Sequence, residues 1–305
     1  MNATARFAEV IEDEEARETL ARLLAERAPE MLERALGTRA KSEAAHTGRM
    51  VSVVGSRGGV GATTVAVNLA WLLAHESGNR VALIDLDLRF GTVALSLDLE
   101  PTHGLREVLE SPDRIDSLFV SSAMARESET LFVLSAEESL VDRLNIEAVA
   151  FDALIADLRA NFDWIVVDAP RSASIPVERV LAQSDKTVLV SDLSLAGMRD
   201  AVRLVGWAKS NAARTEVTVV VNKAGAHGKA EVPQSDFEHG LETKISQILP
   251  YDPKTAGAAS NAGRPIVVTA KNSPLAKAMR KSCTDLTGTE KTARPKTTLG
   301  IFRRK

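Results

Sequence analysis

Apolar and polar positions alternate in blocks along most of the chain, and the blocks predict strands and helices in turn. Short β-branched runs fit buried strands, and longer periodic segments fit helices. The strand runs are residues 50–54, 81–84, 131–134, 164–167, 186–190 and 217–221. The helical segments are residues 65–73, 102–118, 146–159, 194–210 and 273–286. This order predicts a three-layer α-β-α fold with a doubly wound, mainly parallel sheet.

Both ends of the chain differ from this block pattern. Residues 5–36 carry apolar side chains at helical spacing among acids and arginines, and residues 37–48 are small and polar. The sequence therefore predicts a short helical arm and linker over 1–48, a main domain over 49–288 and a basic tail over 289–305. The arm fits either a helix docked on the main domain or a segment that binds a partner or another copy.

The tail combines basic residues with a few apolar ones near its end. Leu299, Ile301 and Phe302 lie among the basic residues Lys291, Arg294, Lys296, Arg303, Arg304 and Lys305. Two interpretations fit this composition: a solvated tail, or a short hook that binds an anionic membrane surface weakly.

A glycine-rich loop joins the first predicted strand to the first predicted helix of the main domain. Such a loop turns backbone N–H groups inward, and the helix N-terminus adds partial positive charge, so the pair can hold phosphate. We read a P-loop that starts at Gly55, with Ala62 where lysine is usual and with Thr63 placed to bind Mg²⁺. The expected phosphate-binding residues are Gly55, Arg57, Gly58, Gly59, Val60, Gly61, Ala62, Thr63 and Thr64. The alternative is an ordinary turn of a dinucleotide-binding fold.

Polar side chains follow three of the predicted strands. Asp85 and Asp87 end the second strand, Asp168 ends the strand that begins at Trp164, and Asn222 follows residues 217–221. The carboxyl ends of parallel strands face the ligand crevice, so these groups are candidates for a metal and nucleotide site. Each of them could instead cap a strand end or a turn.

The loop resembles that of the MinD/ParA family of dimerising ATPases, which begins with a signature lysine before two glycines. Here Arg57 stands before Gly58 and Gly59, and no second lysine follows. This version looks like the CpaE/TadZ branch, which helps place type IVc (Flp/Tad) pili. The Asp-x-Asp of the second strand, the sequence Asp168-Ala169-Pro170 and the segment Pro250-Tyr251-Asp252 extend the resemblance over the main domain.

The resemblance implies an ATP- and Mg²⁺-dependent homodimer that helps to position and assemble a pilus machine, with other pilus-assembly proteins as partners. It implies that Thr63, Asp85 and Asp168 serve Mg²⁺, and that Asp87 and Arg57 act in catalysis. It also implies that Asn222 reads the adenine, with Pro250, Tyr251 and Asp252 beside the base. Because Ala62 replaces the P-loop lysine, we expect a weak ATPase.

Composition narrows the class of protein further. A net charge of −3 gives no general attraction to nucleic acid, and we expect no sequence-specific nucleic-acid binding. Cys283 is the only cysteine, and no apolar run is long enough to span a membrane. These features suit the cytoplasm, and the resemblance implies a peripheral place at the inner membrane or a cell pole.

Three other functions can be compared with the same sequence features. A MinD/ParA-type positioning ATPase and a scaffold that has lost nucleotide binding are the alternatives. The retained Thr63, Asp85, Asp87 and Asp168 argue against the scaffold. A Rossmann dehydrogenase is disfavoured, because the loop lacks Gly-x-Gly-x-x-Gly spacing and no acidic residue is placed to read a ribose.

Overall fold

The computed structural model describes residues 47–100, 103–138, 148–171 and 175–288. The predicted helical arm, except for the end of its linker, and the predicted basic tail lie outside the described residues. Among the described residues, no helix is both long and apolar enough to cross a bilayer.

The described residues form a sheet of eight strands in the order β3-β4-β2-β5-β1-β6-β7-β8. Every pairing is parallel except that of β3 with β4 at one edge. This arrangement confirms the predicted doubly wound, mainly parallel fold. The strands are β1 (Arg49–Gly55), β2 (Val81–Asp85), β3 (Ala125–Arg126), β4 (Leu131–Leu134), β5 (Trp164–Ala169), β6 (Lys186–Ser191), β7 (Glu216–Ala224) and β8 (Ile245–Pro250).

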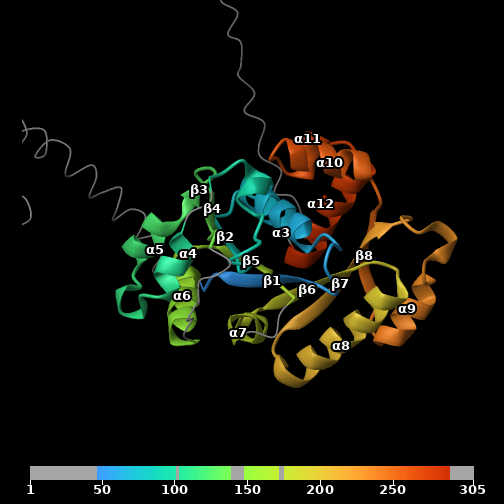
Figure 1. Ribbon diagram of the computed structural model, residues 1–305, viewed down its shortest axis with the longest axis horizontal. Helices are drawn as coiled ribbons and strands as arrows, with labels where there is room; N and C mark the ends of the chain where they lie inside the picture. Colours follow the sequence, from blue (N-terminus) through green and yellow to red (C-terminus); the bar gives the residue numbers. More distant parts are fainter. Residues whose placement is uncertain (1–46, 101–102, 139–147, 172–174, 289–305) are drawn as a thin grey trace, which may run out of the picture. The chain divides into compact units, whose positions relative to one another are not determined.

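Helices cover both faces of the sheet (Figure 1). One face carries α3 (Ala62–Trp71) with its π-helical continuation Leu72–Glu76, and α10 (Pro253–Asn261), α11 (Ile266–Thr269) and α12 (Pro274–Thr287). The other face carries α4 (Gly104–Leu109), α5 (Ser117–Ala123), α6 (Ala148–Asn161), α7 (Ile175–Gln183), α8 (Leu195–Asn211) and α9 (Gln234–Leu241). The predicted three layers are therefore present.

The alternation of side chains along β1 explains why the two apolar layers form. Val51 and Val53 belong to the cluster that α3 and α12 cover, whereas Met50 and Val54 belong to clusters on the opposite face. All four side chains are buried, as expected for a central strand with helices on both faces. The loop that leaves β1 therefore starts from a rigid position in the middle of the sheet.

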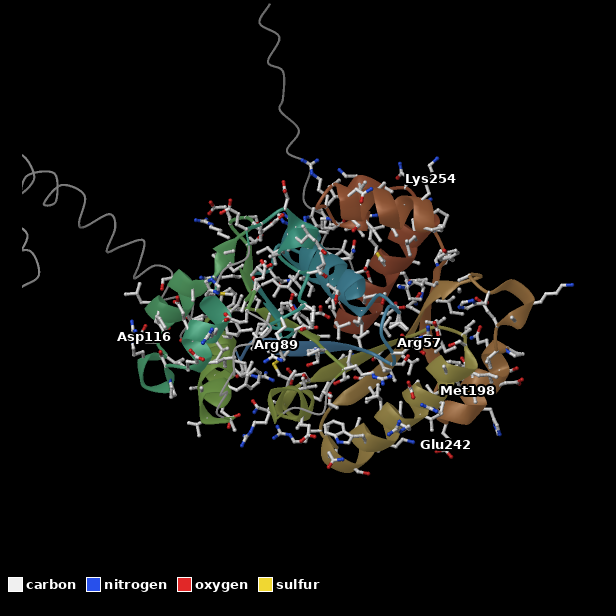
Figure 2. The ribbon with its side chains drawn as sticks, in the orientation of Figure 1. Arg57, Arg89, Asp116, Met198, Glu242 and Lys254 are labelled. Carbon is white, nitrogen blue, oxygen red and sulfur yellow. The ribbon has the colours of Figure 1, made fainter. Side chains whose placement is uncertain are left out.

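The structure differs from the expected elements between residues 102 and 118. The single helical segment predicted over residues 102–118 is broken: α4 ends at Leu109, the Ser111 side chain makes no cap, and only a 3₁₀ turn follows, Pro112–Arg114. The cap is Asp116, labelled in Figure 2, whose carboxylate accepts a 2.8 Å hydrogen bond from the N–H of Phe119 and starts α5. A carboxylate at the N-cap, directly before the first helical residue, accepts from the N–H of the third helical residue, which has no partner within the helix, and so decides where the helix begins.

Candidate functional site

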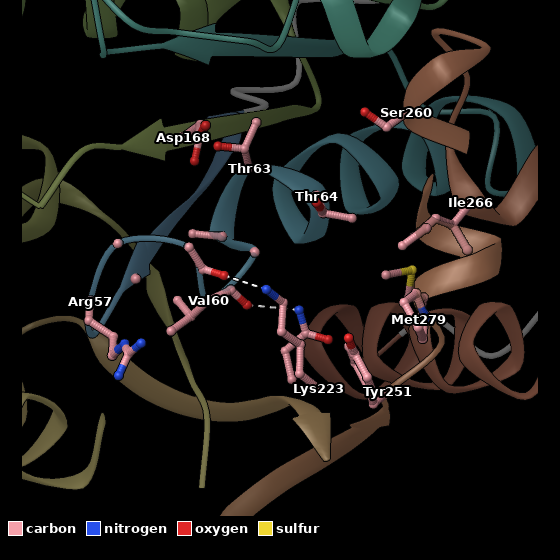
Figure 3. Close-up of a pocket in the computed structure, with 18 of the residues that line it drawn as sticks. Arg57, Val60, Thr63, Thr64, Asp168, Lys223, Tyr251, Ser260, Ile266 and Met279 are labelled. Atoms are coloured by element: carbon pink, nitrogen blue, oxygen red, sulfur yellow. Dashed lines mark hydrogen bonds between the residues drawn. The ribbon is translucent and has the colours of Figure 1, made fainter. Parts of the chain in front are cut away.

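A cavity of about 650 Å³ opens at the carboxyl ends of the central strands, beside the start of α3 (Figure 3). All but one of the predicted site residues line it: Gly55, Arg57, Gly58, Gly59, Val60, Gly61, Ala62, Thr63, Thr64, Asp87, Asp168, Asn222, Pro250, Tyr251 and Asp252. The exception is Asp85. Residues separated by almost 200 positions in the sequence thus meet at one crevice, because the parallel topology brings their strand ends together.

The loop between β1 and α3 is held in a shape that only glycine allows at one position. Gly61 has a φ of 91°, and a Cβ there would lie 2.5 Å from Nδ2 of Asn222. A side chain at Gly61 would be both strained and in collision. Gly61 is also the N-cap of α3, so the loop delivers the helix N-terminus, with its unpaired N–H groups, to the cavity.

The start of the P-loop spacing needs a correction. Counted back from Gly61 by the usual four intervening residues, the first glycine position falls on Ser56, whereas Gly55 is the last residue of β1. Ser56 is buried, and its hydroxyl donates a 2.9 Å hydrogen bond to Oγ of Ser191 on β6. Its side chain therefore replaces the open space of a glycine with a link to the neighbouring strand.

Two carboxylates lie side by side at the ends of neighbouring strands. Asp85 on β2 pairs in register with Asp168 on β5, and both are buried. Burial raises the pKa of Asp168 to about 7, the charge of Asp85 adds to this effect, and a hydrogen bond with the Thr63 side chain opposes it. Burial also raises the pKa of Asp85 to about 6. A cation would relieve the cost of holding two charges here.

Asp85 does not line the cavity, because the chain after β2 folds back over it. Oδ2 accepts a 3.1 Å bond from the N–H of Val93, and Oδ1 accepts a 3.1 Å bond from the N–H of Asp87. Asp87 does line the cavity, and it also caps its own loop, since Oδ1 accepts a 3.0 Å bond from the N–H of Phe90. The capping alternative therefore applies to part of each carboxylate, and their metal and catalytic roles stay predictions.

Arg57 extends from the loop toward the start of α8. Its Nε lies 3.8 Å from Oδ2 of Asp192, and Nη1 lies 3.5 Å from Oγ of Ser194. The side chain is 40% exposed, so this ion pair is weak. In the single chain Arg57 thus faces a carboxylate of its own subunit, within reach of the cavity that it lines.

The ends of β7 and β8 form a further part of the cavity lining, next to the loop. Asn222 is buried, and its Nδ2 donates a 2.8 Å hydrogen bond to the carbonyl of Val60, which leaves Oδ1 as its acceptor. Tyr251 is about half-exposed and is held by a 2.8 Å bond from its N–H to the carbonyl of Ala224. Asp252 caps α10 by accepting a hydrogen bond from the N–H of Thr255. A hydrogen bond with the Thr255 side chain, and then the one with this N–H, lower the pKa of Asp252. The predicted place of an adenine base beside these residues stays a prediction.

Lys223 and Phe90 are among the cavity-lining residues that were not predicted from the sequence. Lys223 reaches the loop, where its Nζ donates a 2.6 Å hydrogen bond to the carbonyl of Gly59. Phe90 is 70% exposed beside Asp87. The sequence shows that Lys223 directly follows Asn222. The direction of the Lys223 side chain, however, depends on its positive φ of 57°, which the sequence does not reveal.

The donor set fits a nucleotide phosphate with Mg²⁺. The loop and the α3 N-terminus offer N–H groups, and Thr63 and Asp168 offer the oxygen ligands that Mg²⁺ prefers. Among the described residues, no group of three or more His, Cys, Asp or Glu side chains could hold a metal by itself. Mg²⁺ would therefore take phosphate oxygens and water as further ligands, which is usual for this ion.

Comparisons with known proteins agree with this geometry. A family model described as an AAA domain, AAA_31, matches residues 48–218. The septum site-determining protein MinD of Thermotoga maritima is 26% identical over 225 residues, which cover 72% of this chain and 81% of that protein.

Solved structures share the fold. A ParA family ATPase from Chlorobium tepidum has a TM-score of 0.72 at 22% identity, covering 79% of this chain and all of that one. MinD from Pyrococcus horikoshii, complexed with Mg-ADP, has a TM-score of 0.67 at 22% identity, covering 78% and 96%. Because the AAA_31 model covers more than half of the 305 residues, the chain belongs to the AAA_31 family of AAA domains, within the MinD/ParA superfamily.

Proposed function

We propose that the protein binds ATP with Mg²⁺, hydrolyses it slowly, and works as a nucleotide-dependent positioning protein. The observation that carries this proposal is the cavity itself, in which a glycine loop, a helix N-terminus and the Thr63–Asp168 pair converge. The same loop presents Ala62 where a lysine would contact the β- and γ-phosphates. The site is therefore equipped to bind a nucleoside triphosphate and poorly equipped to stabilise its transition state.

ATP and ADP should raise the thermal stability of the protein, and Mg²⁺ should increase the effect. A ligand that binds only the folded state at a hundred times its Kd stabilises by about 2.7 kcal/mol. The measurement is a melting curve with each nucleotide, with and without Mg²⁺. Thr63→Val removes only the hydroxyl, so it should keep the nucleotide effect and lose most of the Mg²⁺ increment. Melting curves that no nucleotide shifts would rule out the proposal.

ATP with Mg²⁺ should also convert the chain to a homodimer in which Arg57 contacts the phosphates of the partner. The weak pairing of Arg57 with Asp192 leaves its guanidinium free to move, and its planar fork suits bidentate phosphate contact. Light scattering should show a doubled mass with ATP·Mg²⁺. Arg57→Ala should bind nucleotide and remain monomeric, and Arg57→Lys should dimerise weakly. A wild-type mass that stays monomeric at saturating ATP contradicts this role.

At a finer level, we propose a CpaE/TadZ-type role in assembling a type IVc pilus, with other pilus-assembly proteins as partners. Support comes from the loop, which combines Arg57 with Ala62. The second candidate is MinD/ParA-type positioning of a division site or of DNA, which the similarity to MinD favours. The chain would work in the cytoplasm, peripheral at the inner membrane or a pole, with residues 289–305 adding contact to anionic lipid.

Localisation in cells tests this finer proposal. A fluorescent fusion of the full chain should form membrane or polar foci, a chain that ends at Thr289 should form weaker ones, and deletion of the gene should abolish pili. Each basic residue near an anionic surface contributes about 1 kcal/mol, but the cost of ordering the chain offsets much of this, so the tail of a single copy should bind weakly. Normal pili with displaced division septa would favour the second candidate, and equal foci with and without the tail would remove its membrane role.

A further inference from the structure

Two consecutive residues of β7, Asn222 and Lys223, both donate hydrogen bonds to the loop between β1 and α3, which is called the phosphate loop below. A regular extended strand would not direct both side chains to the same loop. Successive side chains of a strand point to opposite faces of a sheet. Yet Asn222 Nδ2 donates to the carbonyl of Val60 at 2.8 Å, and Lys223 Nζ donates to the carbonyl of Gly59 at 2.6 Å. Dashed lines in Figure 3 mark both bonds, which end on neighbouring peptide groups of the loop.

The backbone of β7 is distorted where these two residues lie. Val221 pairs with Ile248 and Ala224 pairs with Pro250, so β7 has one more residue than β8 in this interval. Lys223 has a φ of 57°, which places a long, non-glycine side chain in the left-handed region. Glycine is the usual residue at a positive φ, so a lysine there is uncommon. Backbone strain of this kind persists where surrounding contacts require it, and it gathers at functional sites.

The two contacts determine which way the loop amides face. In a trans peptide the C=O and the following N–H point in opposite directions. When the carbonyls of Gly59 and Val60 are held toward β7, the N–H groups of Val60 and Gly61 point away from it, toward the interior of the loop. In a loop of this type, these N–H groups donate hydrogen bonds to phosphate oxygens. An ordinary P-loop also has a lysine that fixes the phosphates, and here Ala62 cannot do so.

We propose that Lys223 is a positioning residue that holds the phosphate loop in its ligand-ready form. Together with Asn222, it compensates in part for the lysine that is missing at Ala62. Lys223 acts through the loop carbonyls. It should therefore increase the affinity for the di- or triphosphate group of a nucleotide more than the affinity for the nucleoside. This inference rests on the proposed nucleotide binding, but the clamp itself can be tested without nucleotide.

Lys223→Gly is the sharpest variant, because glycine adopts a positive φ without strain. Its melting temperature should stay close to the wild-type value, since relief of strain offsets the greater freedom of glycine in the unfolded chain. Lys229→Ala is the matched control: Lys229 is an exposed lysine of the same connection, in the 3₁₀ turn Gly228–Ala230, and does not line the cavity. Both variants remove one positive charge from the same region.

The first measurement is the affinity for ADP·Mg²⁺ and for adenosine by titration calorimetry. Lys223→Gly should weaken ADP binding about tenfold, the value of one hydrogen bond from a charged donor, and should change adenosine binding much less. In an Ala62→Lys background the loss should be smaller, because the new lysine shares the task. Unchanged ADP affinity, or an equal loss for ADP and adenosine, would overturn the inference while leaving nucleotide binding by the wild type intact.

The second measurement uses the nucleotide-free protein and trypsin. Cleavage after Arg57 requires the loop to leave its folded shape, so it reports how firmly the loop is held. Lys223→Gly should be cut after Arg57 several times faster than Lys229→Ala and the wild type. Equal cleavage rates would overturn the clamp. If the wild type bound no nucleotide at all, the proposed function would fail, and this second measurement would still decide whether Lys223 holds the loop.

Discussion

Replacing Ala62 with lysine should raise the rate of ATP hydrolysis by about 10²–10³-fold, the usual value of one transition-state charge contact. Ala62 is the first residue of α3 and lines the cavity, so a lysine there starts beside the phosphate-binding N–H groups. Its ammonium would meet the negative charge that develops on the transferred phosphoryl group. The measurement is phosphate release per molecule of Ala62→Lys and of wild type under saturating ATP·Mg²⁺.

The controls separate charge from packing. Ala62→Met adds comparable length without charge and should leave turnover near the wild-type rate. Asp87→Ala, in the Ala62→Lys background, should remove most of the gain if Asp87 orients the attacking water. A lysine at a helix N-terminus is also opposed by the helix dipole, so Ala62→Lys should be slightly less stable without nucleotide and recover when ATP is added. Fast hydrolysis by the wild type, insensitive to Asp87→Ala, contradicts the weak-ATPase assignment.

The sequence predicted the central strands well because each contains a short, mostly apolar run. β1, β2, β5 and β6 are buried along almost their whole length, as central strands covered on both faces must be. The edges were harder. β8 alternates buried and exposed positions and contains Gln247, so its apolar signal is broken, and it was noted only for its Pro250-Tyr251-Asp252 ending. β3 has two residues, too few for any period.

The candidate site was predictable where position on a strand determines function. Asp168 and Asn222 follow apolar runs, and the topology alone brings them to the crevice. Contacts made by loops were not predictable. Asp85 is covered because the chain after β2 returns and donates the N–H of Val93 to it. Lys223 reaches the loop because of a bulge and a positive φ, and neither leaves a periodic signal in the sequence.

The Asp85–Asp168 pair should make the metal-free protein less stable as the pH rises from about 4 to about 7. Burial raises the folded-state pKa of Asp85 to about 6 and that of Asp168 to about 7, above the ordinary value of 3.8. Between these values the folded chain holds protons that the unfolded chain has released, so the free energy of unfolding falls as the pH increases. For Asp85 alone, the whole fall between about pH 4 and about pH 6 corresponds to about 3 kcal/mol. Above about pH 5.5, the two carboxylates together account for a fall of about 2–3 kcal/mol, most of it from Asp168.

The other side chains with shifted pKa values decide which pH range suits this measurement. Glu238 and Asp252 have lowered pKa values, so their contributions change in more acidic solution. The thiol of Cys283 has its pKa raised to about 12 and changes only in alkaline solution. Denaturant unfolding of the EDTA-treated protein at about pH 5.5 and about pH 8 therefore isolates the carboxylate pair from these groups.

Asp168→Asn should weaken this pH dependence, because a neutral amide of the same shape removes one buried charge and its repulsion on the other. The metal-free variant should be more stable than wild type at about pH 8, with a flatter pH dependence between about pH 5.5 and 8. Mg²⁺ with ADP should restore much of the wild-type stability at the higher pH, since a cation offsets both carboxylates, and should do far less for Asp168→Asn.

Asp98→Asn, at an exposed position, serves as the control and should change neither the pH dependence nor the effect of Mg²⁺ with ADP. A wild type whose stability is constant or rises over this range, or an Asp168→Asn that keeps the full Mg²⁺ effect, would show that the pair is not the cation site.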